Sequence, residues 1–152
     1  MNFILLNHNS PSESMQIFIL LKAAYQVEAD LIGVADFVPL KRTIKNIRDS
    51  RTLFYGCIHE DELIGVCEVD GIKVDKPHID SLGVHPSWFR SGIGYGLVEY
   101  VLGELSGEYI TVNTAEKNTP AIALYEKLGF SISNRFETYD EVNMVTLMKN
   151  LY

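Results

Sequence analysis

The chain has 152 residues, of which 47% are hydrophobic and 22% are charged, and 13 Lys and Arg against 20 Asp and Glu give a formal net charge of −7. This length fits one domain with a full hydrophobic core, and the composition excludes a disordered chain. The chain contains no run of about 20 apolar residues, so no membrane span is predicted. The excess of acidic residues argues against generic nucleic-acid binding. We therefore expect a single domain over residues 1–152, with neither a membrane nor a nucleic acid as partner.

The first half of the chain predicts a strand over residues 2–7 and two helices over residues 11–27 and 40–49. A hairpin of two strands is expected next, over residues 52–59 and 63–70. The first helix begins with a capping-box pattern, because Ser10 precedes Pro11 at the first helical position and Glu13 follows Ser10 by three residues. The segment 28–39 between the two helices is expected to be irregular. The acidic turn between the last two strands favours the hairpin.

The second half predicts strands and helices over residues 79–84, 93–105, 109–114, 119–128, 130–136 and 142–149. The helix 93–105 carries the clearest apolar stripe of the chain. It should form a right-handed crossover between two parallel strands, whereas the other strand pairs are expected to be antiparallel. The fold class is therefore α/β of the α+β type: a single domain with a mixed, mostly antiparallel sheet, helices on both faces and the order β-α-α-β-β-β-α-β-α-β-β.

The cysteines, the histidines and the N-terminal residues show no pattern typical of a disulfide, a metal site or a signal peptide. Cys57 and Cys67 lie in apolar, strand-like segments, which favours buried free thiols over a disulfide or a zinc site. His8, His59 and His85 lack metal-ligand spacing with any Cys or acidic partner, so no metal site is expected. The N-terminal apolar run is too short for the core of a signal peptide, and we expect a cytoplasmic location.

The most informative segment, Val84–Gly96, joins a strand to an amphipathic helix through a basic turn with glycines. Gly92 and Gly94 allow a ligand to approach the backbone, and the first amides of a helix have no partners within it. With the helix dipole, these amides form an anion site suited to a pyrophosphate, and Arg90 adds a positive charge. The spacing fits neither a Rossmann fingerprint nor a Walker A loop. Taken alone, the glycines could instead only shape a turn.

A second segment, Asn118–Phe130, reads Asn-x-x-Ala-x-x-x-Tyr-x-x-x-Gly-Phe. It predicts a short capped helix that ends at Gly129. Tyr125 is then either an amphipathic residue at the edge of the core or a phenol presented to a cleft as hydrogen-bond donor or general acid.

Together the two segments resemble the GNAT superfamily of N-acetyltransferases. The resemblance rests on Val84-x-Pro86, the Gly92-x-Gly94 pair and the ending Tyr125…Gly129-Phe130. It covers residues 79–130, and the order of predicted elements extends it over nearly the whole chain. It implies an acetyl-CoA-dependent acyltransferase that passes an acetyl group directly to a primary amine of a small molecule or protein, in a ternary complex.

The resemblance also implies where acetyl-CoA binds: in an opening between two splayed parallel strands, 79–84 and 109–114. The pantetheine arm would be bound by backbone groups of Leu82, Gly83 and Val84. One backbone N–H among them would polarise the thioester carbonyl. Groups that would cradle the pyrophosphate belong to Phe89, Arg90, Ser91, Gly92, Ile93, Gly94 and Tyr95. Asn118 would contact the pantetheine side, and Tyr125 would lie near the sulfur.

One position departs from the family pattern. The pattern usually has Arg or Gln where this chain has Phe89, and Arg90 follows one residue later. Backbone amides are expected to carry most of the site, so binding should survive this change.

The sequence leaves the general base open between His78 and Asp80. In a regular strand His78, Asp80 and Leu82 share one face, and Ile79 and Ser81 share the other. The family often places a carboxylate near Asp80, whereas His78 has the better intrinsic pKa. We rank Asp80 first, acting directly or through water. Alternatively, His78 is a solvated strand-end residue, and Asp80 caps a loop or binds the acyl acceptor.

The acceptor is expected to lie against the first two helices and their link. Acidic residues there would suit a cationic amine or form a solvated loop, and they are Glu28, Asp30 and Asp36. Aromatic residues that could line the same pocket are Tyr25, Phe37 and Tyr139.

Two other functions stay open: a non-catalytic domain that binds or senses acyl-CoA, and a binding module that uses the glycine turn for another phosphate ligand. A homodimer is also possible, because the apolar last strand, residues 142–149, could pair with a second copy.

Overall fold

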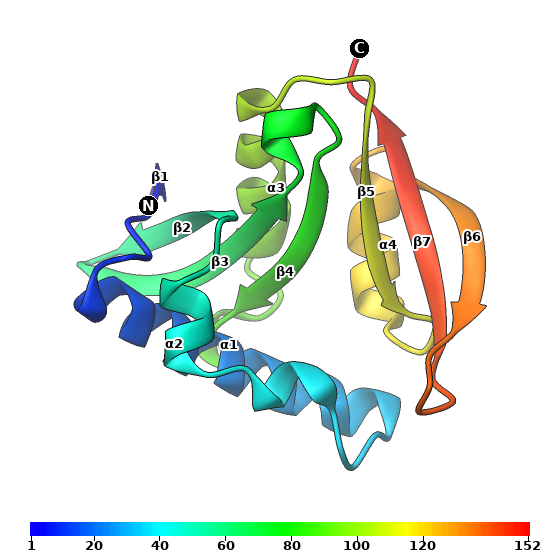
Figure 1. Cartoon of the computed structure of the whole chain (residues 1–152), viewed down its shortest axis with the longest axis horizontal. Helices are drawn as coiled ribbons and strands as arrows, with labels where there is room; N and C mark the ends of the chain where they lie inside the picture. The colour runs from blue at the N-terminus through cyan, green and yellow to red at the C-terminus, as the bar shows by residue number, and fades with distance from the viewer.

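A seven-stranded sheet in the order β1-β2-β3-β4-β5-β7-β6 organises the computed structural model, which describes residues 1–152 (Figure 1). The strands are β1 (Asn2–Leu5), β2 (Leu53–His59), β3 (Glu62–Asp70), β4 (His78–Val84), β5 (Tyr109–Ala115), β6 (Ser131–Glu137) and β7 (Asn143–Asn150). The α-helices are α1 (Pro11–Ile32), α2 (Ile44–Arg48), α3 (Ile93–Glu104) and α4 (Thr119–Lys127). Short 3₁₀-helices are η1 (Val38–Lys41), η2 (Ile72–Val74) and η3 (Pro86–Trp88). The predicted element order and fold class are confirmed.

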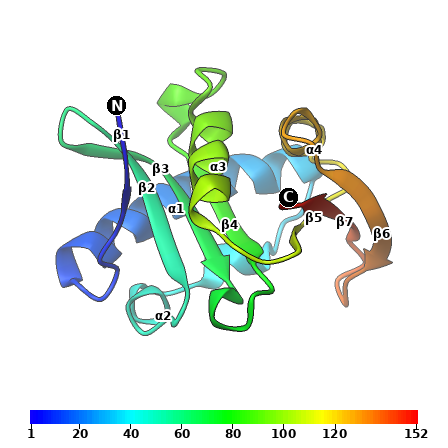
Figure 2. The same cartoon turned by 90° about the horizontal axis from the view of Figure 1, so that it is seen from above.

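Helices cover both faces of the sheet, as expected. Figure 2 shows α1 and α2 on one face and α3 and α4 on the other. The stripe of α1 buries Ile17, Leu20 and Leu21 in one cluster with Phe54 and Val66. Each fully buried aliphatic side chain contributes roughly 1.5–3 kcal/mol, so these stripes hold the helices firmly against the sheet.

The larger cluster lies on the other face. There α3 buries Leu97, Val98 and Val101 against Ile79 and Val112, from the two central strands. The predicted stripe of this helix is therefore confirmed, and it spans the junction between β4 and β5.

These two central strands, β4 and β5, form the single parallel pair of the sheet, and they separate after a short contact. Only His78 with Thr111 and Ile79 with Val112 are paired. Beyond these positions the two strands diverge, as Figure 1 shows. The backbone edges of both strands are then free of each other, which gives the splayed opening that the resemblance implies.

A β-bulge in β4 corrects one expectation. Glu68 lies opposite Ser81 and Val69 opposite Ile79, so Asp80 is one residue in excess on β4. An extra residue inverts the alternation of side chains. Ile79 and Ser81 were expected on one face, but Ile79 packs in the α3 cluster while Ser81 donates a hydrogen bond to Glu68 on the α1 face.

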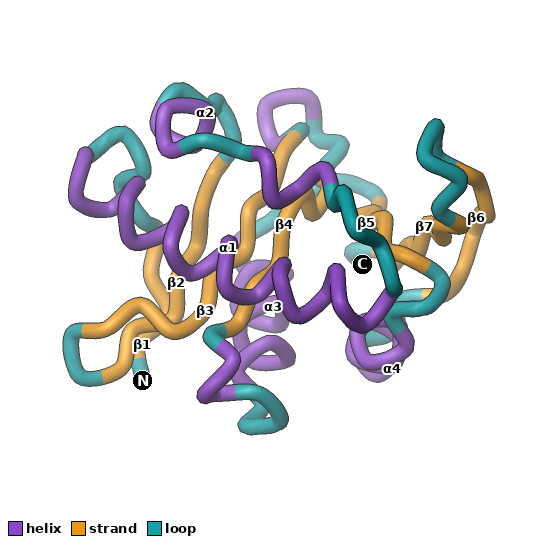
Figure 3. The backbone as a smooth tube through the Cα atoms, turned by 90° about the horizontal axis from the view of Figure 1, so that it is seen from below, coloured by secondary structure: helices purple, strands orange, loops and turns teal.

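The first helix is longer than its sequence pattern indicated. We expected an end near Val27 and an irregular segment 28–39, but α1 continues to Ile32 and Gly33 ends it in the left-handed conformation, with φ of 75°. Figure 3 shows that α1 crosses beneath β2, β3 and β4 until its C-terminal end reaches α4. The extra turn therefore carries Glu28 to the splayed opening.

Two other local predictions were wrong. The side chain of Ser10 makes no capping hydrogen bond, and Glu13 instead accepts one from the amide of Asn7. The capping box lies at α2, where Thr43 and Asn46 cap each other reciprocally. The second helix, expected over 40–49, is split into η1 and the short α2.

The last strand, β7, lies inside the sheet and has no free edge. The predicted route to a homodimer through the last strand is wrong, because β7 lies between β5 and β6 and both of its edges are paired. The homodimer itself stays a prediction.

Cys57 and Cys67 are buried free thiols, as expected. None of the helices combines the length and apolar character needed to cross a bilayer.

Candidate active site

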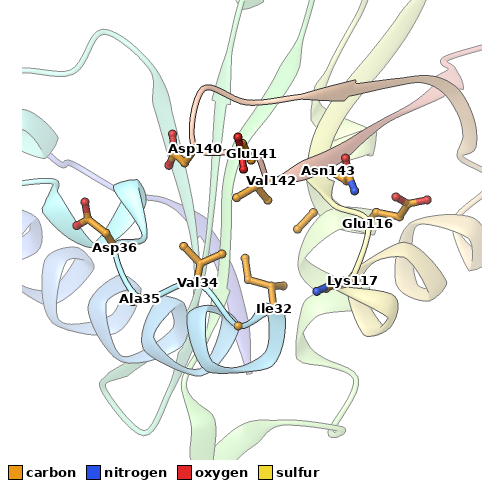
Figure 4. Close-up of a pocket in the computed structure, with 12 residues that line it drawn as sticks. Ile32, Val34, Ala35, Asp36, Glu116, Lys117, Asp140, Glu141, Val142 and Asn143 are labelled. Atoms are coloured by element: carbon orange, nitrogen blue, oxygen red, sulfur yellow. The ribbon is translucent and has the colours of Figure 1, made fainter.

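A cavity of about 450 Å³ lies where β4 and β5 diverge. β4 and β5 line it, together with the end of α1, the start of η1 and α4. A groove of about 570 Å³ adjoins it, between the end of α1, the β5–α4 link and the β6–β7 hairpin (Figure 4). The two hollows share Ala115, Asp140 and Val142 as lining residues, so they lie side by side.

The start of α3 presents unused backbone amides. Gly92 caps the helix at a φ of 81°, a conformation that a residue with a side chain rarely adopts. No hydrogen bond of the structure uses the amides of Gly92, Ile93, Gly94 or Tyr95. Free amides at the positive end of a helix form an anion site.

The second glycine of the motif acts through packing. A Cβ atom at Gly94 would lie 3.0 Å from Cδ1 of Leu124, so the glycine allows α3 to approach α4 closely. Ala121 and Tyr125 on α4 line the cavity. The close approach therefore keeps the anion site beside the splayed opening.

The turn before α3 contains the residues that depart from the family pattern. Phe89 is exposed, and its amide donates to the carbonyl of Pro86. Arg90 is exposed and adopts a left-handed φ of 61°. The hydroxyl of Ser91 donates to the carbonyl of Trp88, which closes this turn.

The edge of β4 offers further free amides to the opening. The amide of His85 donates to the carbonyl of Ile64 on β3. Because hydrogen-bonding direction alternates along an antiparallel strand, Ser81 and Gly83 also direct their backbone groups at β3. Those of Leu82 and Val84 face the gap, where β5 no longer pairs with them.

Tyr125 lies in the wall of the cavity and is 3% exposed. Its ring packs edge-on against Phe130, with 5.3 Å between ring centroids, and its hydroxyl makes no hydrogen bond within the protein. Burial raises the pKa of Tyr125 well above its usual value. The phenol therefore keeps its proton at neutral pH, as a proton donor must.

His78 and Asp80 both line the cavity, so the structure brings the two candidate bases together. Nδ1 of His78 lies 2.6 Å from Oγ1 of Thr111, and its Nε2 lies 3.9 Å from Oδ1 of Asp80. Burial lowers the pKa of His78. Burial and the nearby Glu68 charge raise the pKa of Asp80 to about 6. At neutral pH the imidazole is therefore mainly neutral and the carboxylate mainly ionised.

Asn118 connects the two sides of the opening. Its Oδ1 accepts from the amide of Ala121 and caps α4, and its Nδ2 donates to Oε1 of Glu28 at 3.1 Å. Burial raises the pKa of Glu28, and the hydrogen bond from Asn118 opposes this effect. The contact ties the end of α1 to the start of α4.

The residues expected to bind the acceptor divide into two groups. Those that line the two hollows are Tyr25, Glu28, Asp36 and Phe37. Tyr25 and Phe37 pack edge to face, with 6.0 Å between their ring centroids. Asp30 and Tyr139 line neither hollow: Asp30 accepts a hydrogen bond from Gln26, and Tyr139 projects fully into solvent from the β6–β7 hairpin.

The groove has an apolar middle and charged ends. Figure 4 shows Ile32, Val34 and Val142 in the middle, with Asp36 and Asp140 at one end and Glu116 and Lys117 at the other. Two of the carboxylates have partners, since Asp36 pairs with Lys41 at 3.0 Å and Glu116 with Arg135 at 3.6 Å. Asp140 and the neighbouring Glu141 form no ion pair, so they add negative charge to the groove.

Sequence reasoning missed a buried polar network behind β4. Its members are Arg42, Ser50, Thr52, Glu68 and Ser81. The available signal was Glu68 itself, a carboxylate within the apolar strand 63–69, because such a residue is buried only with partners.

Comparisons with known proteins agree with this geometry. The family model described as "Acetyltransferase (GNAT) family" matches residues 16–130. Peptidyl-lysine N-acetyltransferase YjaB of Salmonella typhimurium is 30% identical over 132 residues, which cover 87% of this chain and 79% of that protein. The UPF0157 protein YqkA of Bacillus subtilis is 35% identical over 126 residues, which are 82% of this chain but only 36% of that longer protein.

Solved structures show the same fold at low sequence identity. The ribosomal-protein-S18-alanine N-acetyltransferase of Escherichia coli superposes with a TM-score of 0.77 at 17% identity, covering 99% of this chain and 93% of that one. An aminoglycoside 6'-N-acetyltransferase complexed with coenzyme A gives a TM-score of 0.75 at 17% identity, covering 100% of this chain and 98% of that one. These structures share the fold, and because the family model matches residues 16–130, the chain belongs to the acetyltransferase (GNAT) family.

Proposed function

We propose that this chain transfers the acetyl group of acetyl-CoA to a cationic primary amine by direct attack in a ternary complex. The observation that carries the proposal is the set of unused amides at the start of α3, beside an opening that Tyr125 lines with a phenol hydroxyl that no other protein group engages. An anion site and a proton donor next to one cleft suit a thioester that ends in a pyrophosphate-linked nucleotide. A cytoplasmic location stays a prediction that accompanies this function.

The residues present fit acetyl-CoA along the whole opening. The amides from Gly92 to Tyr95 would receive the pyrophosphate, with Phe89, Arg90 and Ser91 forming the rim of the turn. The free backbone groups of Leu82 and Val84 would hold the pantetheine arm; Gly83 instead directs its groups at β3 and lets α1 approach, since a Cβ there would lie 2.9 Å from Leu21. Asn118 has hydrogen-bonding capacity beyond its two internal contacts and would reach the same arm.

Chemistry at the amine begins with its charge. An alkylammonium of pKa near 10.4 needs roughly 4–5 kcal/mol to lose its proton near pH 7. Asp80 has a pKa of about 6, so it is mainly ionised at pH 7 and would accept that proton directly or through water. We rank it above His78, whose Nδ1 lies within hydrogen-bond distance of Thr111.

Transfer then needs a group for each developing charge. The amine nitrogen forms a bond to the carbonyl carbon and gives up its second proton to solvent. The carbonyl oxygen gains negative charge, which the amide of Leu82 would stabilise by a hydrogen bond. The bond from carbon to sulfur breaks as Tyr125 donates its proton to the departing sulfur. Tyr125 afterwards recovers a proton from solvent and Asp80 passes the proton that it accepted to solvent, so the reaction releases one proton overall.

The charge of the acceptor site supports a cationic substrate. Glu28 and Asp80 line the cavity beside Tyr25 and Phe37, and carboxylates with aromatic rings attract an ammonium group. Asp140 extends the negative charge into the groove. Three of the similar proteins are named for acetylation of peptidyl-lysine, of a ribosomal-protein alanine and of an aminoglycoside, and each of these acceptors is an amine.

Binding and transfer can be tested separately. Acetyl-CoA at about 100 times its Kd should stabilise the chain by about 2.7 kcal/mol in thermal unfolding, whereas S-acetylpantetheine, which lacks the pyrophosphate, should stabilise it far less. Release of free thiol is then measured with a lysine peptide, an alanine-terminated peptide, spermidine and kanamycin. Equal stabilisation by the two thioesters would contradict the anion site.

The two rival functions predict different results in the same assays. An acyl-CoA sensor is stabilised by acetyl-CoA but releases no thiol with any of the amines. A module for another phosphate ligand gains no stability from acetyl-CoA, which would overturn the proposal.

A further inference from the structure

Glu68 is a charged side chain in the middle of the sheet, and it is 1% exposed. Nη1 and Nη2 of Arg42 donate to its two carboxylate oxygens at 2.6 Å and 2.9 Å. Thr52 donates at 2.7 Å and Ser81 at 2.8 Å. Burial pushes the pKa of Glu68 upward, but the hydrogen bonds from Arg42 and Thr52 outweigh it and lower the pKa. The carboxylate is therefore ionised and fully engaged.

These contacts, which we call the Glu68 network, join two parts of the active site to each other and to the start of β2. Arg42 directly follows η1, whose start lines the cavity with Val38 and Pro39. Thr52 lies at the entry to β2, and Ser81 lies on β4 within the cavity wall. The network thus fixes the acceptor wall, η1, to the strand that faces the thioester.

The network holds β4 at its bulge. Glu68 lies opposite Ser81, and the residue before Ser81 is the excess residue Asp80. The residue after it, Leu82, directs its amide into the gap. The hydrogen bond from Ser81 to Glu68 therefore lies directly between Asp80 on one side and the amide of Leu82 on the other.

Stability alone does not account for such a group. A buried ion pair is often replaced by apolar residues of similar volume without loss of stability, because desolvation offsets the attraction. The neighbouring positions on β3, Cys67 and Val69, are apolar and buried. A charged residue with its partners at this one position indicates a role in placing the strand.

We propose that Glu68, with Arg42, is a positioning residue: it holds Ser81 so that Asp80 and the Leu82 amide keep their places in the active site. The proposal rests on the proposed function for its catalytic consequence. Its structural content, the dependence of Asp80 and Leu82 on Glu68, does not need a known acceptor.

The charge of Glu68 also reaches Asp80. The charged groups that act on Asp80 are Glu68 and Asp70 on β3 and Arg42 after η1, and the imidazole of His78 on β4 lies 3.9 Å from it. The other titratable groups that line the same cavity are Tyr25 and Glu28 on α1, Tyr125 on α4 and Asp140 on the hairpin. Burial is the main reason for the raised pKa of Asp80, Glu68 and Asp70 add to it, and Arg42 opposes it. Replacing Glu68 by glutamine leaves Arg42 without its counter-charge, so the pKa of Asp80 should fall.

The first test uses the chain without any acceptor. The carboxyl carbon of Asp80 and the amide of Leu82 are followed by NMR across pH in wild type, Glu68→Gln, Ser81→Ala and the control Lys41→Met. Lys41 precedes Arg42 but is exposed and pairs with Asp36 instead. We expect a lower pKa of Asp80 in Glu68→Gln, a shifted Leu82 amide in Glu68→Gln and Ser81→Ala, and wild-type values in Lys41→Met. Wild-type values in both Glu68→Gln and Ser81→Ala would overturn the proposal.

The second test measures turnover with the amine of the panel that wild type acetylates fastest. A displacement of about 1 Å can lower a rate 100-fold, so we expect kcat to fall at least tenfold in Glu68→Gln and less in Ser81→Ala. The Kd of acetyl-CoA should change less than kcat. If Glu68→Gln fails to fold, Ser81→Ala, which keeps the ion pair, decides the matter by the same readouts. If the wild-type protein transfers no acetyl group, the proposed function is contradicted. The NMR titration still tests whether Asp80 and Leu82 depend on Glu68.

Discussion

The two sides of the active site are built in different ways. The side expected to hold acetyl-CoA consists of backbone: the amides that open α3 and the free edge of β4. The acceptor side consists of side chains from the end of α1, from η1 and from the β6–β7 hairpin. A backbone site tolerates changes of side chain such as Phe89, provided the turn keeps its conformation. A side-chain site changes its ligand with each substitution.

This difference predicts which measured quantity each substitution alters. Changes on the backbone side should alter the affinity for acetyl-CoA. Changes on the acceptor side should alter the KM of the amine. Changes at the junction, where Asp80 and Tyr125 lie, should alter kcat.

The largest effect is expected from Asp80→Asn. Loss of a general base lowers a rate by about 100-fold to 10,000-fold, and asparagine keeps the shape of the side chain. In wild type, kcat should rise with pH around a midpoint of about 6, because the raised pKa of Asp80 means that the base is protonated below this value. The pH–rate profile of both proteins measures this.

His78→Gln is the matched comparison at the junction. If His78 is the base, this variant loses the rate and Asp80→Asn keeps it. That result would transfer the role to the imidazole and would contradict the assignment of Asp80.

Tyr125→Phe should lower kcat by about 100-fold, since the departing thiolate loses its proton donor. The Kd of acetyl-CoA should stay within about twofold of wild type, because the ring and its contact with Phe130 remain. Tyr100→Phe serves as control, as Tyr100 packs with Phe3 and Tyr55 away from the cavity. An unchanged kcat would remove the phenol from the chemistry.

Gly92→Val tests the backbone side. A residue with a Cβ needs about 1–2 kcal/mol to hold the left-handed conformation, so the turn should relax and displace the amides of α3. We expect acetyl-CoA to bind about tenfold more weakly in calorimetry, with the KM of the amine little changed. Gly103→Ala, at an open position of the same helix, should bind acetyl-CoA like wild type. Equal affinities in all three proteins would show that the α3 amides do not bind the cosubstrate.

The contrast between the two sides also explains what the sequence could predict. The glycine turn and Tyr125 are local patterns, and both lie where the pattern indicated. The bulge at Asp80 arises from a mismatch between two strands, which no spacing within β4 reveals. The length of α1 was misjudged because the acidic residues after Val27 resemble a loop, although Gly33 is a typical helix end. The acceptor side depends on that end, and it was therefore predicted least well.

The smallest effect is expected from Asp140→Asn on the acceptor side. Asp140 is exposed at the border of both hollows and forms no ion pair, so its attraction for a cationic amine is that of a surface charge, about 0.2–1 kcal/mol. The KM of a cationic amine should rise about twofold to fivefold at low salt, and the difference should shrink at high salt because ions screen exposed charges. Neither kcat nor the Kd of acetyl-CoA should change. Asp61→Asn, in the β2–β3 turn, removes the same charge far from the groove and should leave all three constants unaltered. A change in acetyl-CoA affinity in Asp140→Asn would show that the two sides are not separate, because a side chain of the acceptor wall would then contribute to the cosubstrate site.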